Sequence, residues 1–147
     1  MVLKALAGTE VAAKIGGSLS GSIIESNETC MVVNKESIAG VARFLKESPE
    51  FDFNYLNNVT AVDNFDHFEV VYNLTSLAKK HTLCLKVRTP GRDNPEVPSV
   101  TSIWRSADFQ EREVYDLMGI SFTDHPNLKR IALWDGFEGH PLRKDFL

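Results

Sequence analysis

The sequence lacks the usual markers of a bound cofactor. It holds two cysteines, Cys30 and Cys84, which stand far apart and belong to no CxxC or Cys/His pattern. This spacing argues against a structural zinc site and against an iron–sulfur cluster. The glycine pair Gly16-Gly17 does not have the spacing of a phosphate-binding loop. We therefore expect no cofactor in this chain, and both cysteines should be small buried apolar residues.

An excess of positive charge is missing as well. The formal net charge is −4 over 147 residues, with acidic and basic side chains interspersed, which disfavours binding to nucleic acid or to an anionic membrane surface. No apolar run approaches the roughly 20 residues of a membrane-spanning helix, and the opening residues 1–7 are too few for a secretory signal. We expect a soluble, cytoplasmic chain that reaches a membrane only through a partner.

What the sequence does contain is typical of a single globular domain. A chain of 147 residues that is 43% hydrophobic and 24% charged can bury its own core. Residues 9–15 have a weak helical pattern that ends at a glycine pair, and residues 22–33 alternate. Residues 38–45 place apolar side chains at the i, i+3, i+4, i+7 spacing of an amphipathic helix, which should end before Pro49.

The middle of the chain has the period of β-strands. From Phe51 the hydrophobic period changes from 3.6 to 2, and turn residues at 63–66 separate two runs. Apolar and mixed positions alternate in residues 68–74 and again in residues 82–88. We expect these strands to form an antiparallel β-meander covered by helices, which gives an α+β fold.

A loop and a further helix should follow the meander. Residues 89–98 include three prolines and a glycine among polar residues, which predicts an exposed loop. A helix is expected over residues 107–118. Ser106 can serve as its N-cap, and Gly119 can adopt the positive φ that ends it.

The last part of the chain is unusual in composition. Residues 119–147 show little periodicity but contain many aromatic and aliphatic side chains, which argues against disorder. A structureless stretch of this length in a compact domain is commonly functional or ordered against something else. The expected organisation is a compact α+β part, residues 1–118, followed by an extended partner-binding segment, residues 119–147.

The predicted helix carries a dense set of charges, Glu111, Arg112, Glu113 and Asp116, and paired carboxylates are one device of general acid–base catalysis. Glu111 and Glu113 project about 200° apart on a helix, so they cannot flank one substrate. Arg112 and Asp116 stand at i and i+4, where a helical ion pair explains them. We therefore favour a solvated or partner-facing charged surface over a catalytic site.

The C-terminal histidines suggest a metal site only weakly. His125, His140 and Asp145 are residue types that bind zinc, but their spacings match no ligand motif, and both histidines precede proline. No serine stands in a nucleophile-elbow pattern. The stretch from Pro141 to Phe146 sets two cations and a carboxylate between apolar residues. This composition suits an interface anchor and a solvated tail about equally.

Three sequence blocks are similar to those of a known family, the C-type subunits of respiratory complex I. Residues 111–122, EREVYDLMGISF, closely resemble the signature helix of that family. The run HPNLKRI, residues 125–131, resembles the family's His-Pro-x-Leu-x-Arg-Ile block, and GHPLRKD, residues 139–145, its closing block. Residues 97–104 also look like the family. The resemblance therefore covers the chain from about residue 80 onward.

The resemblance implies a non-catalytic scaffold subunit in the peripheral arm of a complex I type oxidoreductase, which couples electron transfer from NADH or another donor to quinone with ion transport. The subunit would carry no cofactor. It would lie beside the large, D-type subunit, which is related to nickel–iron hydrogenases, and near the small, B-type subunit that holds the terminal iron–sulfur cluster, on the cytoplasmic side of the cell membrane. The residues implied in partner binding are Glu111, Arg112, Glu113, Asp116, His125, Pro126, Arg130, His140, Pro141, Leu142, Arg143, Lys144, Asp145 and Phe146.

Two alternatives stay open at this point. The same module is known from membrane-bound energy-converting [NiFe] hydrogenases and formate hydrogenlyases, and the signature helix does not separate these from the quinone complex. In that case a partner subunit would hold nickel and iron. A stand-alone hydrolase or metalloenzyme is the more distant alternative, and turnover or stoichiometric metal in the isolated chain would support it.

Overall fold

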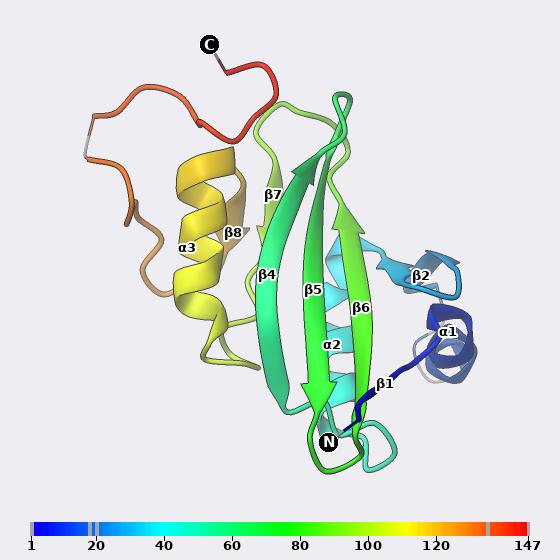
Figure 1. Ribbon diagram of the computed structural model, residues 1–147. Coiled ribbons are helices and arrows are strands. Elements are labelled where there is room, and N and C mark those ends of the chain that lie inside the picture. The colour runs from blue at the N-terminus through cyan, green and yellow to red at the C-terminus, as the bar shows by residue number, and fades with distance from the viewer. Residues whose placement is uncertain (1, 18, 20, 135, 147) are drawn as a thin grey trace.

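The computed structural model describes residues 2–17, 19, 21–134 and 136–146 (Figure 1). The helices are α1 (Gly8–Gly16), α2 (Ile38–Glu47), preceded by the 3-10 turn η1 (Lys35–Ser37), and α3 (Ala107–Met118). The strands are β1 (Lys4–Ala5), β2 (Ile23–Ser26), β3 (Met31–Val33), β4 (Tyr55–Asp63), β5 (Phe68–Ser76), β6 (His81–Arg88), β7 (Glu96–Pro98) and β8 (Ser121–Thr123). The chain is mixed α+β, as the sequence predicts.

The main sheet has the strand order β2-β3-β6-β5-β4, and the short β1 pairs with β6 on the same edge as β3. Strands β4, β5 and β6 form the expected antiparallel meander, with Val59 opposite Tyr72 and Tyr72 opposite Leu85. Strand β3 runs parallel to β6, with Met31 opposite Leu85. Successive antiparallel strands are joined by tight turns, so the meander follows from local connections.

Helix α2 covers one face of this sheet (Figure 1). Its apolar stripe is the one that the sequence predicts, and these side chains are fully buried. They pack in one core with the inward side chains of β5, among them Phe68 and Tyr72, which are also fully buried. The helix ends at Glu47, before Pro49, because proline restricts the residues in front of it. The buried stripe therefore fixes which face of the sheet is covered.

Helix α3 lies beside β4 and has the predicted bounds (Figure 1). It ends at Gly119, whose φ of 76° is the left-handed conformation expected there. The prediction of Ser106 as N-cap is wrong in its detail: the side chain makes no capping bond, and its Oγ donates to the carbonyl of Leu56 at 3.3 Å.

Two predictions about the C-terminal half need correction. The loop at residues 89–98 is not irregular throughout, because Glu96–Pro98 forms β7, and Val97 is fully buried. Strand β7 pairs in parallel with β8, Ser121–Thr123, so the segment after Gly119 is not extended coil from its start. Ile120 and Phe122 belong to the common core. The sequence does not indicate β7 and β8, because a strand of three residues is too short to show an alternation of apolar and polar side chains.

The cysteines differ from each other in burial. Cys30 is 6% exposed, as predicted, whereas Cys84 is only half-buried, because it lies on the sheet face opposite α2. Within the described residues, none of the helices combines the length and the apolar character that a bilayer crossing requires.

Candidate partner-binding surface

The end of α3 is capped by the segment that follows β8, residues 124–134 and 136–146, here called the C-terminal segment. The last carbonyl groups of a helix have no partner within the helix. Here the carbonyl of Leu117 accepts a hydrogen bond from the backbone N–H of Leu142 at 3.0 Å. The carbonyl of Met118 accepts one from Nε of Arg143 at 2.6 Å. The C-terminal segment is thus bound to the chain's own helix.

Two further contacts complete this cap. His140 donates from Nδ1 to the carbonyl of Asp116 at 3.1 Å. The Nη2 atom of Arg143 lies 3.5 Å from the carbonyl oxygen of Gly119. A guanidinium at this place also complements the negative end of the helix dipole. The approach is so close that a Cβ atom on Gly119 would lie 2.6 Å from both Arg143 Nη2 and His140 Cδ2.

The side chain of Asp116 holds the middle of the C-terminal segment. Its Oδ2 accepts hydrogen bonds from three successive backbone N–H groups, those of Ile131 at 3.2 Å, Ala132 at 2.7 Å and Leu133 at 3.0 Å. Its Oδ1 lies 3.4 Å from Nε of Arg130. Burial by itself raises the pKa of the Asp116 carboxyl, but the three N–H groups and the Arg130 charge outweigh it, so the net direction is downward.

Glu111 joins α3 to the residues that follow β7. Its fully buried carboxylate accepts from Oγ of Ser99 at 2.6 Å and from the backbone N–H of Val100 at 2.9 Å. The Nε2 atom of His125 lies 4.0 Å from Glu111 Oε1 and 3.1 Å from Asp108 Oδ1. Burial raises the pKa of Glu111 to about 7, against the opposing effect of its two hydrogen bonds. Helix α3 therefore connects β7's end with the C-terminal segment.

The charged face of α3 is therefore not the solvated or partner-facing surface that the sequence suggested. Glu111 and Asp116 are fully buried, and Arg112 is 8% exposed. The predicted pair of Arg112 with Asp116 is also wrong: Arg112 donates from Nε to the carbonyl of Lys129 at 3.3 Å, and Asp116 pairs with another arginine. Of the four charges, Glu113 alone is exposed. The buried charges bind α3 to other parts of the same chain.

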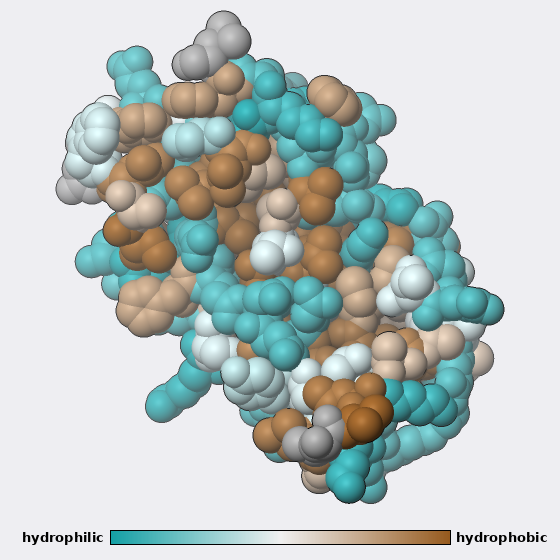
Figure 2. All heavy atoms as spheres, viewed as in Figure 1, coloured by the Kyte–Doolittle hydropathy of each residue, from teal (hydrophilic) through white to brown (hydrophobic). Residues whose placement is uncertain are grey.

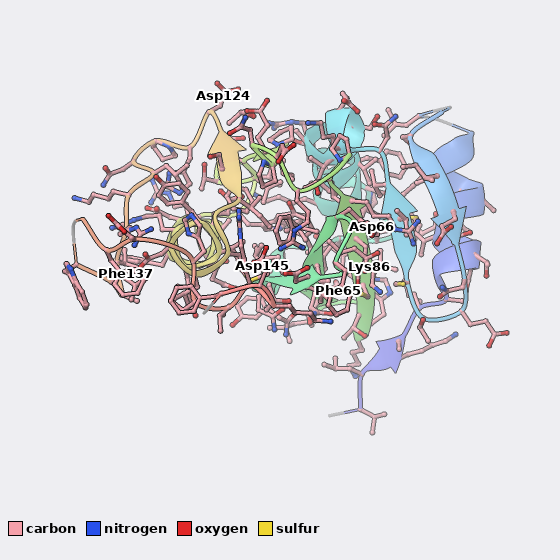
Figure 3. All side chains as sticks on the ribbon, turned by 90° about the horizontal axis from the view of Figure 1, so that it is seen from above. Phe65, Asp66, Lys86, Asp124, Phe137 and Asp145 are labelled. Carbon is pink, nitrogen blue, oxygen red and sulfur yellow. The ribbon has the colours of Figure 1, made fainter. Side chains whose placement is uncertain are left out.

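A second anchor ties the segment to the meander. Arg92 forms a two-bond ion pair with the buried Asp63 and a further one with Asp145, at 3.1 Å. Oδ2 of Asp63 also accepts the backbone N–H of Lys144 at 2.9 Å. The Lys144 ammonium lies 4.2 Å from the ring centre of Phe65, and Figure 3 places Asp145 near that ring. The Arg92 guanidinium holds the pKa of Asp63 well below its usual range.

The C-terminal segment exposes several large apolar side chains. Trp134 is 68% exposed and Leu142 61%, while Ile131 and Phe146 are each 39% exposed. The ring of Phe137 packs edge-on against Trp134, with centres 4.8 Å apart. Figure 2 shows apolar surface gathered on the side of the molecule that carries this segment. Large apolar side chains held outward on a fixed backbone are typical of an interaction site.

The predicted partner-binding residues thus fall into three groups. Those buried in the chain are Glu111, Arg112 and Asp116. Those half-buried are His125, Arg130, His140, Pro141 and Arg143. Those exposed are Glu113, Pro126, Leu142, Lys144, Asp145 and Phe146. Their binding to a partner stays a prediction.

Sequence reasoning missed four residues that build this surface. The sequence pattern places Asp63 in a turn and Arg92 in a loop, and neither position indicates a tertiary ion pair. Ser99 gives no signal. Trp134 stands out only as an aromatic residue in coil, and a large aromatic residue without a predicted core position could have indicated exposure.

The charged groups of α3 are used inside the chain. The carboxylates of Glu111 and Asp116 are engaged by internal donors. In the part of the chain that the structure describes, no three His, Cys, Asp or Glu side chains gather in a way that could hold a metal ion. The structure does present large apolar side chains, among them Trp134 and Leu142, that point outward from a hydrogen-bonded backbone.

Comparison with known proteins defines the class. Residues 31–147 match the family model described as the respiratory-chain NADH dehydrogenase, 30 Kd subunit. The chain therefore belongs to this family, the C-type subunits of complex I, as the three sequence blocks predict.

Individual relatives agree with this assignment. The chain is 43% identical to the C subunit of NADH-quinone oxidoreductase from Roseiflexus castenholzii over 148 aligned positions, which cover 96% of this chain and 84% of that protein. It is 48% identical to the second of the C subunits of NADH-quinone oxidoreductase from Rhizobium etli over 117 positions, which cover 78% of this chain and 62% of the relative.

Solved structures share the fold. A chain of an archaeal respiratory membrane complex, the membrane-bound sulfane sulfur reductase, superposes with a TM-score of 0.76 at 27% identity, covering 95% of this chain and 85% of that one. A trypsin-resistant fragment of Nqo5 superposes with a TM-score of 0.62 at 28% identity, covering 82% and 98%.

Proposed function

We propose that the chain is a non-catalytic scaffold subunit in the peripheral arm of a complex I type oxidoreductase that passes electrons from NADH or another donor to quinone. The observation that carries this proposal is the C-terminal segment, which the chain's own charges fix in place with Leu142 and Trp134 facing outward. The names of the two relatives described above, both C subunits of NADH-quinone oxidoreductase, support membership in such a complex.

In this proposal the outward side of the C-terminal segment docks on the hydrogenase-related large subunit, near the small subunit with the terminal iron–sulfur cluster. Those partners hold the cofactors, and this chain holds none. The chain meets the membrane only through the complex, on its cytoplasmic side. It supports ion-coupled electron transfer by keeping its partners in position.

The C-terminal segment is already ordered in the free chain, which favours docking. Ordering a flexible chain on binding costs conformational entropy, which lowers affinity. Because Asp116 and Arg143 already hold the backbone of the segment, little of this cost remains for the docking step. The buried charges of α3 therefore act on docking indirectly, and the apolar side chains supply the contact area.

A second candidate is the equivalent subunit of a membrane-bound energy-converting [NiFe] hydrogenase or formate hydrogenlyase. The observation that favours this candidate is the likeness to a chain of an archaeal respiratory membrane complex, with a TM-score of 0.76. That complex is by name a sulfane sulfur reductase. The same fold thus occurs in a complex whose named acceptor is not quinone. The metal content of the neighbouring large subunit separates the candidates.

The test is purification of the native complex through a tag on this chain, followed by mass spectrometry of the partners and metal analysis. We expect a large subunit without nickel and an iron–sulfur small subunit. Nickel in the purified complex would select the second candidate. Recovery of the chain with neither partner would contradict both.

A matched pair of variants tests the docking surface itself. Leu142→Asp places a charge on the C-terminal segment, whereas Leu77→Asp places one at the turn after β5, where the leucine is 54% exposed. We expect Leu142→Asp to lose the two partners and Leu77→Asp to retain them. Equal recovery of the partners with both variants, each folded by circular dichroism, would contradict the proposed surface.

A further inference from the structure

The two cysteines lie opposite each other on neighbouring strands. In the parallel pair of β3 and β6, Met31 is opposite Leu85 and Val33 is opposite Val87. Continuing this register by one residue places Cys30 opposite Cys84. Successive side chains of a strand point to alternate faces. Since Met31 and Leu85 are fully buried in the core, the two thiols lie together on the other face of the sheet.

The backbone of Cys30 is held firmly at this place. Its N–H donates to Oδ1 of Asn27 at 2.9 Å, and its carbonyl accepts from the N–H of Asn27, also at 2.9 Å. Helix α1 begins directly on it, because a Cβ atom on Gly8 would lie 2.1 Å from the Cys30 carbonyl oxygen. Neighbouring strands lie about 4.8 Å apart. This spacing falls within the range of about 4.4–6.8 Å that Cα atoms of disulfide-bonded cysteines span.

The two thiols differ in access to solvent. Cys84 is half-buried and lines a surface hollow together with Leu6 and Thr29, whereas Cys30 is 6% exposed. Burial raises the pKa of the Cys84 thiol, and the neighbouring Cys30 raises it further. The thiolate is the reactive form, so reaction at Cys84 should quicken as the pH rises. A small reagent therefore meets Cys84 first and Cys30 only afterwards.

We propose that Cys30 and Cys84 form a redox-active dithiol that closes to an intramolecular disulfide by exchange with a low-molecular-weight disulfide. The Cys84 thiolate attacks one sulfur of the reagent, which forms a mixed disulfide and releases one thiol. The Cys30 thiolate then attacks Sγ of Cys84 and releases the second thiol. The two cysteines together lose two electrons and two protons, and the reagent disulfide is reduced to two thiols.

The disulfide would tie the N-terminal part of the sheet to the meander. Strand β3 carries β2 and α1 with it, and the new bond would join this part covalently to β6. Cys30 precedes residue 31, where the match to the family model begins. The dithiol therefore includes a residue outside the matched region. Neither cysteine belongs to the C-terminal segment, so this proposal is independent of the proposed docking surface.

The test is oxidation of the full chain with oxidised glutathione over a range of pH, followed by alkylation and peptide mapping without reduction. We expect a mass loss of about 2 Da, a cross-linked pair of peptides that contain Cys30 and Cys84, and a rate that rises with pH. Glutathione adducts on both cysteines without a cross-link would overturn the proposal. An unmodified wild-type chain at the highest pH would also overturn it.

Two variants test the order of the steps. Cys30→Ala has no resolving thiol, so it should accumulate the glutathione adduct on Cys84, which is transient in the wild-type chain. Cys84→Ala leaves the buried Cys30 and should stay largely unmodified. Faster modification of Cys84→Ala than of Cys30→Ala would contradict the assignment of Cys84 as the attacking residue. Circular dichroism of both variants checks that they fold.

Discussion

Oε1 of Glu111 lies 4.0 Å from Nε2 of His125, and neither side chain is exposed to solvent. His125 accepts at Nδ1 from the backbone N–H of Asn127 at 2.9 Å, and its Nε2 donates to the backbone carbonyl of Asp108 at 3.2 Å. Nε2 also lies 3.1 Å from Oδ1 of Asp108. The fourth group that acts on this site is the buried Tyr72, whose pKa is raised by burial and then by the Glu111 charge. The Glu111 carboxyl and the His125 imidazole thus lie together inside the chain.

This site predicts a specific dependence of stability on pH. Burial raises the pKa of Glu111 from 4.5 to about 7, so the folded chain holds this proton more tightly than the unfolded chain does. The stabilising contribution is therefore complete below about pH 4.5 and is lost as the pH rises through about 7. Its full size is on the order of 3 kcal/mol. Thermal unfolding at several pH values measures it.

Glu111→Gln should remove this dependence. A glutamine can accept from the Val100 N–H and donate to Oγ of Ser99, so the hydrogen bonds of the site are kept while the titration is lost. We expect the Tm of the wild-type chain to fall between about pH 5 and about pH 8 by more than that of the variant. Glu113→Gln, on the exposed side of the same helix, is the control. A variant with the wild-type slope would show that Glu111 does not titrate in this range.

Asp116→Asn should loosen the C-terminal segment and leave α3 intact. The substitution removes the charge that three backbone N–H groups and Arg130 share. We expect a loss of about 2 kcal/mol in the free energy of unfolding. Faster hydrogen exchange is expected at residues 131–133, with unchanged exchange in β5. Unchanged protection of residues 131–133 would show that Asp116 is not their anchor.

Gly119→Ala should destabilise the chain by more than Gly136→Ala. Both glycines have positive φ, 76° and 88°, so each substitution carries a backbone cost of about 1 kcal/mol. At Gly119 the new Cβ also collides with Arg143 and His140, whereas at Gly136 no atom of the described residues, its chain neighbours aside, lies within 4 Å of the new Cβ. The difference in Tm between the two variants measures the effect of the close contact that Arg143 and His140 make with Gly119. Equal losses would mean that the C-terminal segment does not lie on this glycine.

Arg143→Ala should impair assembly before it changes any chemical step. The variant loses the bonds to the Met118 and Gly119 carbonyls, worth about 2 kcal/mol together, so the docking surface loses its support. The yield of complete complex and its quinone turnover per assembled complex measure the two effects separately. Arg43→Ala, on the exposed side of α2, is the matched control. Normal assembly with altered turnover would contradict this account.

The sequence was sufficient for the parts of the fold that depend on local signals. Helix α3 has the bounds that were predicted from Ser106 before it and Gly119 after it, and Gly119 adopts the expected positive φ. The meander was predicted because each strand of eight or nine residues shows several alternations. The three-residue strands β7 and β8 depend on pairing between distant parts of the chain, so their short patterns were read as loop and coil.

The burial of the charges could not be predicted from the sequence. Glu111, Arg112 and Asp116 have the spacing of a solvated helix face, and only their distant partners reveal otherwise. Glu111 accepts from Ser99, and Asp116 from Ala132, each more than ten residues away. A dense charge cluster on a helix is compatible with a solvated face and with a buried face. Only tertiary packing decides between the two.

Hydrogen exchange of residues 124–146 in the free chain and in the assembled complex tests the central claim most directly. The proposed docking surface predicts added protection on assembly around Trp134 and Leu142, while the turn around Leu77 exchanges at the same rate in both states. The free chain should already protect residues 131–133, which Asp116 holds. Equal protection of the whole segment in the free and assembled states would contradict the account.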